Sequence, residues 1–118
     1  MNDKQSVFLV HLFHERPDLL AGLLPKVQED FMAWLPANTH VVSAFLRYAR
    51  ELKRTGKRDY YSAYAIRERL RWDSMVSEVG TEFKISNNMT PALARLVMAI
   101  DPSLDGMFKL KGEKNESR

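Results

Sequence analysis

The sequence predicts a mainly α protein, a single compact helical domain of five or six helices with a minor two-stranded β-ribbon. The chain has 118 residues, of which 45% are apolar and 28% charged, and this is enough to enclose one hydrophobic core. In several segments the apolar residues recur at spacings of three and four, as on one face of a helix. Single prolines and glycines stand where helices would start or stop.

Three short helices are expected at the start of the chain. Pro17 ends the first, and Asp18 is a plausible cap for the second. Pro25 suits the first position of the third, where its missing N–H costs nothing. The predicted helices span residues 4–14, 18–24 and 25–35.

Two further helices are expected in the middle of the chain. The first spans residues 39–55 and carries one continuous apolar stripe with basic residues mainly beside it. Gly56 follows it, where a left-handed residue commonly ends a helix. The second begins after Ser62, which can act as its N-cap, and a loop is predicted over residues 74–82.

The last third is expected to combine one helix with the β-ribbon. Thr90 and Pro91 form a start signal, a hydroxyl cap followed by proline at the first helical position, and Asp101 closes the helix. Two segments alternate apolar and polar side chains and could pair as an antiparallel ribbon, residues 83–86 and 107–110. The prediction is therefore one domain over residues 1–110 and a mobile polar tail over residues 111–118.

Composition argues against several classes of site. The chain has no cysteine, which removes disulfides, thiol catalysis and thiolate metal sites. Its five glycines are scattered singly, so no phosphate-binding glycine loop is present. Its acidic residues form no catalytic or metal-binding pattern. His11 and His14 could share a helix face with Glu15 as metal ligands, but histidines at the edge of a core are the more common case. We therefore expect no enzyme activity, cofactor or metal.

The apolar stretches also bear on location. The longest near the start, beginning at Val7, is far shorter than the roughly 20 residues that span a bilayer. No positively charged segment and small-residue cleavage site surround it, as a signal peptide would require. We expect a cytoplasmic protein with no membrane partner.

Positive charge is concentrated in one segment. The net charge is +3, yet residues 47–71 contain nine basic and three acidic residues. A localised basic surface attracts nucleic-acid phosphates through counterion release. The same residues also fit a solvated helix face, or ion pairs with Glu51, Glu68 or Asp73. The candidate phosphate contacts are Arg50, Lys53, Arg54, Lys57, Arg58, Arg67 and Arg71.

Polar residues around Thr90 are candidates for contacts with base edges. Asn87 and Asn88 lie just ahead of a helix N-terminus, which can enter the major groove or receive a phosphate. Arg95 is expected to project from the same helix one turn later. Turn and cap chemistry alone also accounts for the asparagines. The helix, strand and cap pattern suggests a helix-turn-helix or winged-helix relation.

The aromatic residues fall into two groups. Tyr60, Tyr61 and Tyr64 lie in the basic segment, where their rings could stack on bases or pack inward with the hydroxyl in water. The others fall at positions expected to face the core: Phe31, Trp34, Phe45, Tyr48, Trp72, Phe83 and Phe108.

A series of short motifs occurs in a distinctive order between residues 31 and 110. The motifs are Asn38-Thr39-His40-Val41, Ala49-Arg50-Glu51-Leu52-Lys53 with Gly56, Glu68-Arg69-Leu70-Arg71-Trp72, Phe83-Lys84-Ile85-Ser86-Asn87-Asn88, Ala94-Arg95-Leu96 with Met98, and Pro102-Ser103-Leu104-Asp105-Gly106-Met107-Phe108. This series resembles a set of small uncharacterised proteins of bacteriophages and prophages. The resemblance implies a phage setting for residues 31–110 and leaves residues 1–30 as an N-terminal helical extension.

The residues and the resemblance together suggest a phage- or prophage-encoded, non-enzymatic nucleic-acid-binding protein with a regulatory role. DNA is the expected partner rather than RNA, in the cytoplasm of the bacterial host. The alternative is a small phage effector that binds and inhibits or redirects a host protein through an apolar N-terminal surface. A homodimer through the same surface is compatible with either function. That surface would comprise Phe8, Leu12, Phe13, Leu19 and Leu23.

Overall fold

The structure, a computed structural model, describes residues 11–76 and 87–109. Within these residues the protein is mainly helical, as predicted. The longer helices are α2 (Pro25–Trp34), α3 (Thr39–Thr55), α4 (Ala63–Val76) and α5 (Thr90–Ile100). Short 3-10 helices join or extend them: η1 (Pro17–Leu20), η2 (Leu35–Ala37), η3 (Asn87–Met89) and η4 (Pro102–Leu104). Residues 11–15 are also helical.

Several predicted helix boundaries are confirmed. α2 begins at Pro25, and α3 ends at Thr55 with Gly56 in the left-handed conformation, φ 63°. The N–H of Gly56 donates to the carbonyl of Lys53 at 3.2 Å, which closes the last turn of α3. α5 ends at Ile100, directly before Asp101. These boundaries depend on local backbone chemistry, which is why sequence signals found them.

Two element predictions are wrong. Residues 18–24 do not form an α-helix, because the short segment between two prolines makes only the 3-10 turn η1. The loop predicted from Ser74 begins too early, since α4 continues to Val76. The Ser74 hydroxyl donates to the carbonyl of Arg71 at 2.9 Å, so this polar residue stays inside the helix.

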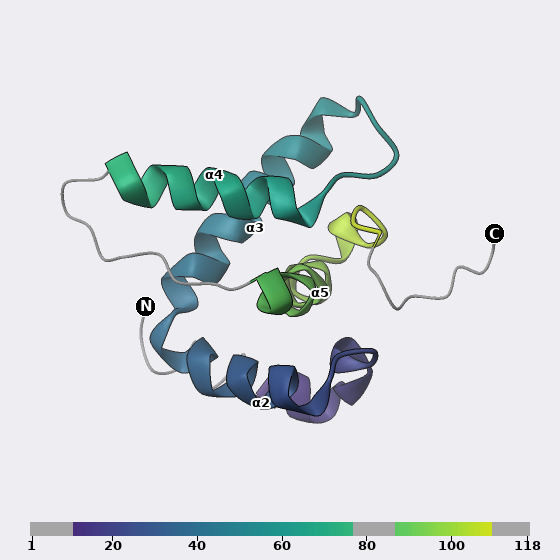
Figure 1. Ribbon diagram of the computed structural model, residues 1–118. Helices are drawn as coiled ribbons and strands as arrows, with labels where there is room; N and C mark the ends of the chain where they lie inside the picture. The colour runs from purple at the N-terminus through teal and green to yellow at the C-terminus, as the bar shows by residue number, and fades with distance from the viewer. Residues whose placement is uncertain (1–10, 77–86, 110–118) are drawn as a thin grey trace.

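The helix α5 lies at the centre of the fold. Figure 1 shows it nearly end-on, between α2 and the pair formed by α3 and α4. It contacts α3 and α4, together with η1, η3 and η4. Every residue from Ala92 to Val97 is buried. Because these residues leave no free face for a DNA groove over the middle of α5, the described residues do not support the predicted helix-turn-helix or winged-helix arrangement with this helix reading bases.

The N-terminal apolar residues belong to the same core. Phe13 is 3% exposed and meets the ring of Phe31 edge-on, with the ring centroids 5.5 Å apart. Leu20 is 7% exposed. Leu12, Leu19 and Leu23 pack against the core and are partly buried, and Phe8 lies outside the described residues. Of the expected apolar contact surface, Phe13 is therefore interior, and Leu12, Leu19 and Leu23 are partly covered.

The predicted β-ribbon is not observed in the described residues. Phe108 instead forms an isolated parallel bridge with Tyr61, and the N–H of Tyr61 donates to the carbonyl of Met107 at 2.8 Å. The Phe108 ring lies against Phe45 of α3, with centroids 5.9 Å apart. Burial of this ring fixes the segment beside the start of α4. The other predicted strand, residues 83–86, and the predicted tail lie outside the described residues.

Candidate nucleic-acid interface

Four of the predicted phosphate contacts remain available on one loop. We call residues 53–58, the last turn of α3 and the residues that follow it, the basic loop. Its cations are all exposed, and within the described residues none lies within ion-pair distance of a carboxylate. The C-terminal end of a helix also favours nearby positive charge. These cations are Lys53, Arg54, Lys57 and Arg58.

The backbone of the basic loop is held by one tyrosine. The amides of Lys57 and Arg58 both donate to the hydroxyl oxygen of Tyr61, each at 3.2 Å. Thr55 Oγ1 lies 2.9 Å from the same oxygen and donates its own proton to the carbonyl of Leu52 at 2.7 Å. Because these bonds fix the loop, its cations project from an ordered backbone. Of the three clustered tyrosines, Tyr61 therefore has a structural role.

Lys109 joins this surface from the other end of the chain. The bridge between Tyr61 and Phe108 brings the next residue to the loop, and Lys109 Nζ lies 4.4 Å from the centroid of the Tyr60 ring. Tyr60 is 52% exposed and lines a hollow together with Lys57, Arg58 and the acidic Asp59. No local sequence signal could have found Lys109, because its position depends on a pairing between distant segments.

Arg50 is engaged in an ion pair. Its Nε lies 2.7 Å from Oδ2 of Asp101, which joins α3 to the end of α5. The other oxygen of Asp101 accepts from the amide of Ser103 at 3.0 Å and from its hydroxyl at 2.7 Å. The Ser103 hydroxyl, followed by Arg50, holds the pKa of Asp101 below its usual value. Arg50 therefore has a structural partner.

Replacing Asp101 with asparagine is expected to destabilise the protein at neutral pH and to have little effect in acid. Asparagine keeps an oxygen for Ser103 but removes the charge that faces Arg50. Because the folded-state pKa of Asp101 is lowered, its contribution is present above the unfolded pKa, about 3.9, and disappears as the pH falls through the folded pKa. Urea unfolding of both proteins at pH values of about 7 and 2 measures the difference.

The control is Asp105→Asn, which removes an exposed carboxylate that makes no ion pair in the described part of the chain. It should change the free energy of unfolding little at either pH. An equal loss in Asp105→Asn, or a loss in Asp101→Asn that does not depend on pH, would contradict a specific role of the ion pair.

The arginines of α4 divide between ion pairs and solvent. Arg67 pairs with Glu68, and its side chain is 12% exposed. Arg69 Nε lies 3.3 Å from Asp73 Oδ1. Arg71 is exposed and makes no ion pair among the residues described. Arg67 and Arg69 therefore form ion pairs, but Glu68, Arg69 and Asp73 are too exposed for the buried network that was the alternative. The basic surface is still smaller than the sequence alone suggested.

Tyr48 completes the arrangement around Asp73. Its hydroxyl donates to Asp73 Oδ2, and its ring lies 5.0 Å from the guanidinium of Arg47 and 5.1 Å from that of Arg69. The Tyr48 hydroxyl, and secondarily Arg69, hold the pKa of Asp73 below its usual value. Tyr48, Asp73 and Arg69 together join α3 to α4, and the charge of Arg69 is partly neutralised by Asp73.

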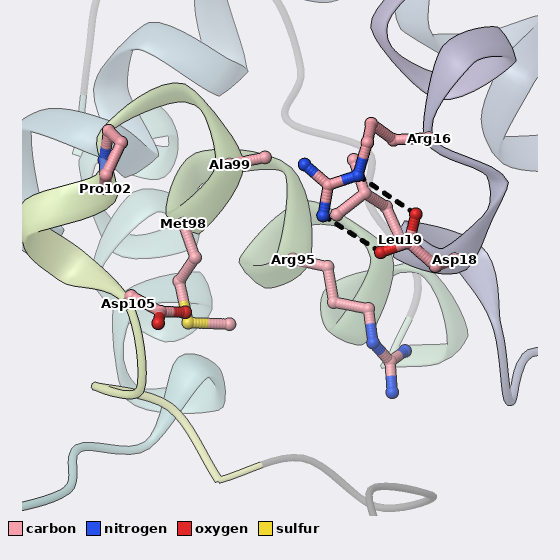
Figure 2. Close-up of a pocket in the computed structure, with 8 residues that line it drawn as sticks. All are labelled: Arg16, Asp18, Leu19, Arg95, Met98, Ala99, Pro102 and Asp105. Atoms are coloured by element: carbon pink, nitrogen blue, oxygen red, sulfur yellow. Dashed lines mark hydrogen bonds and ion pairs between the residues drawn. The ribbon is translucent and has the colours of Figure 1, made fainter.

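Arg95 is buried, contrary to the prediction that it projects from the surface of the helix. It is 7% exposed and lines a pocket that includes Arg16, Asp18 and Asp105 (Figure 2). The ion pair at the edge of this pocket joins Arg16 to Asp18 at 2.9 Å. Because α5 is enclosed by its neighbours, a residue one turn after its start lies inside the protein and cannot approach a base edge.

Asn87 and Asn88 are exposed but do not stand at a free helix end. They belong to η3, and the following residue of α5, Thr90, is fully buried. The carbonyl of Asn87 accepts from the hydroxyl of Tyr64 at 3.4 Å. Asn87 and Asn88 line one pocket with Tyr64 of α4, whereas Arg95 lines a different pocket.

Trp72 is exposed, contrary to the prediction that it faces the core. It is 60% exposed, and Met75 and Val76 beside it are 65% and 60% exposed. Trp72 follows the buried Leu70 by two positions, which is about 200° around a helix and therefore points outward. Helical arithmetic on the Ile66 and Leu70 stripe could have found this.

The described residues contain neither a metal-binding cluster nor a membrane-spanning helix. No group of three or more histidine, aspartate or glutamate side chains is placed to hold a metal ion among them, and His11 and His14 are both exposed. None of the described helices has the length and apolar content that a bilayer crossing requires.

Comparison of the chain with protein-family models, with curated proteins and with solved structures finds no match. The candidate interface is therefore defined by its own charges and contacts.

Proposed function

We propose that this protein is a non-enzymatic nucleic-acid-binding protein that contacts phosphates through the basic loop. The observation that carries the proposal is the set of four exposed cations on an ordered backbone, with no carboxylate partner among the described residues. Lys109 adds a fifth positive charge beside them. Such a surface favours a polyanion because each phosphate that binds releases condensed counterions.

The remaining predicted contacts contribute unequally to this proposal. Arg71 extends the positive surface along α4. Arg50 and Arg67 are less available because Asp101 and Glu68 neutralise them. Arg95 is buried and makes no contribution. The proposed interface is therefore centred on the basic loop, and it recognises phosphates rather than a base sequence.

The wider setting is part of the same proposal. We infer a phage or prophage origin from the order of motifs between residues 31 and 110, and a regulatory role on DNA in the cytoplasm of the host from the proposed nucleic-acid binding. Capture of a host protein, or homodimer formation, through the N-terminal apolar residues is less well supported, since Phe13 and Leu20 are buried in the core.

Salt dependence tests the proposed function. Fluorescence anisotropy of a labelled 20-nucleotide DNA, single-stranded or duplex, measures the dissociation constant between 50 and 200 mM NaCl. Four or five phosphate contacts predict a decrease in affinity of about 50- to 500-fold over this range, because the logarithm of the binding constant falls by roughly 0.7 to 0.9 per contact for each tenfold increase in salt. An affinity that does not change with salt would overturn the proposal.

A further inference from the structure

The outward face of α4 combines exposed rings with positive charge. Counting 100° per residue places Tyr64, Arg71 and Trp72 on the side of the helix away from the buried Ile66 and Leu70 stripe, with the exposed Glu68 among them. Tyr64 is 43% exposed and Trp72 60%. We call Tyr64, Arg71 and Trp72 the α4 outer face. The basic loop is held by Tyr61, so it lies at the N-terminal end of α4, the end that carries Tyr64.

We infer that the α4 outer face binds single-stranded nucleic acid, with bases stacked on Trp72 and Tyr64 and a phosphate on Arg71. This inference rests on the proposed function, because the basic loop would supply most of the phosphate contacts. It adds that the strand is unpaired and names the residues that hold its bases.

Exposure of a tryptophan is the first argument. Large apolar side chains exposed together usually mark a contact surface. An indole ring offers the largest stacking area of any side chain, and stacking on aromatic rings is how many proteins bind single strands without sequence preference. Trp72 is not needed to close the described core, because Leu70 fills the inward position at this end of α4.

Charge selects a polyanion for this face over an apolar partner. Arg71 is exposed and free of ion pairs in the described part of the chain, and Glu68, which lies on the same side of α4, pairs with Arg67. On the adjoining side of α4, Arg69 shares Asp73 with the hydroxyl of Tyr48, and Arg47 lies on the same ring. Among the described residues, the net charge around Trp72 is therefore positive.

Spacing and the central position of α5 favour a single strand over a duplex. Tyr64 and Trp72 are separated by about 12 Å along the helix axis, with Glu68 midway between them and Arg71 one residue before Trp72. Bases in a duplex are stacked on one another and do not offer their faces to a protein ring, whereas unpaired bases do. Since α5 is buried, the described helices offer no separate recognition element for a major groove.

The test compares Trp72→Ala with Met75→Ala on labelled single-stranded oligo(dT) and on a duplex. Met75, which is 65% exposed, is an apolar neighbour of the α4 outer face but has no ring. We expect Trp72→Ala to weaken single-strand binding by about tenfold or more and duplex binding by less than twofold, whereas Met75→Ala changes neither by more than twofold. Trp72→Phe, which keeps a ring, should recover much of the lost affinity. Oligo(dT) should also quench tryptophan emission in the wild type but not in Trp72→Phe.

The other outcomes separate this inference from the proposed function. Trp72→Ala could weaken single-strand and duplex binding equally, or could weaken neither of them. If salt still weakens binding in either case, the inference fails and the proposed function stands. Absence of binding to either DNA at low salt overturns both. If light scattering shows that Trp72→Ala and Met75→Ala each convert a dimer to a monomer and single-strand affinity is unchanged, a second copy covers this face and the inference is wrong.

Discussion

Reversing all four cations of the basic loop to glutamate is expected to abolish DNA binding, with a decrease in affinity of at least about 10³-fold at low salt. Each reversal removes a phosphate contact and adds a repulsive charge, and the side chains are exposed, so the core should be unaffected. Two of the new carboxylates would lie at the C-terminal end of α3, where each is expected to cost about 0.3–1 kcal/mol. The substitutions are Lys53→Glu, Arg54→Glu, Lys57→Glu and Arg58→Glu, and anisotropy at 50 mM NaCl measures the outcome.

A matched pair of double variants separates the location of charge from its total. Lys53→Glu with Lys57→Glu and Arg16→Glu with Lys26→Glu change the net charge equally. Arg16 and Lys26 are exposed on another part of the fold, where each already pairs with a carboxylate. The first pair should weaken binding strongly and the second only slightly. Equal losses would mean that net charge alone, and not the basic loop, determines affinity.

Replacing Leu96 by alanine is expected to lower the free energy of unfolding by about 2–5 kcal/mol. Leu96 is fully buried on α5, which is surrounded by the other helices, so the remaining cavity has neighbours on every side. A domain of this size is stable by only about 5–15 kcal/mol, so the loss is a large fraction of the total. Urea unfolding followed by circular dichroism measures it.

The control for this prediction is Leu24→Ala, which removes the same side chain at a site that is 70% exposed. It should change stability by less than about 0.5 kcal/mol. If the two variants lose similar stability, α5 is not the centre of the core. If Leu96→Ala keeps its stability, the packing described around α5 is wrong.

Helix boundaries were the most predictable part of the structure. Pro25, Gly56 and the pair Thr90-Pro91 act through the backbone of their own segment, and the structure places helix ends at or within one residue of each. The pairing of the predicted β-ribbon could not be derived from such local signals. Phe108 contacts Tyr61 and Phe45 because its ring is buried there, and that choice depends on segments far away in the chain.

The candidate site was only partly predictable. The cluster of charge on the basic loop followed from the sequence, since a run of basic residues beside a helix-ending glycine must stay near solvent. Which arginines lose their free charge did not follow from it. Asp101 approaches Arg50 only when the end of α5 lies against α3, and Tyr48 and Arg69 reach Asp73 only when α3 lies against α4.

Local chemistry was therefore sufficient to predict a helical chain, its main helix ends and a basic turn after α3. Contacts between distant segments decided that α5 is enclosed, that Arg95 is inside the protein, and that Lys109 lies beside Tyr60. The reason is physical: caps, turns and charge runs act within a few residues, whereas burial and ion pairing depend on which surfaces meet when the chain condenses around a single core.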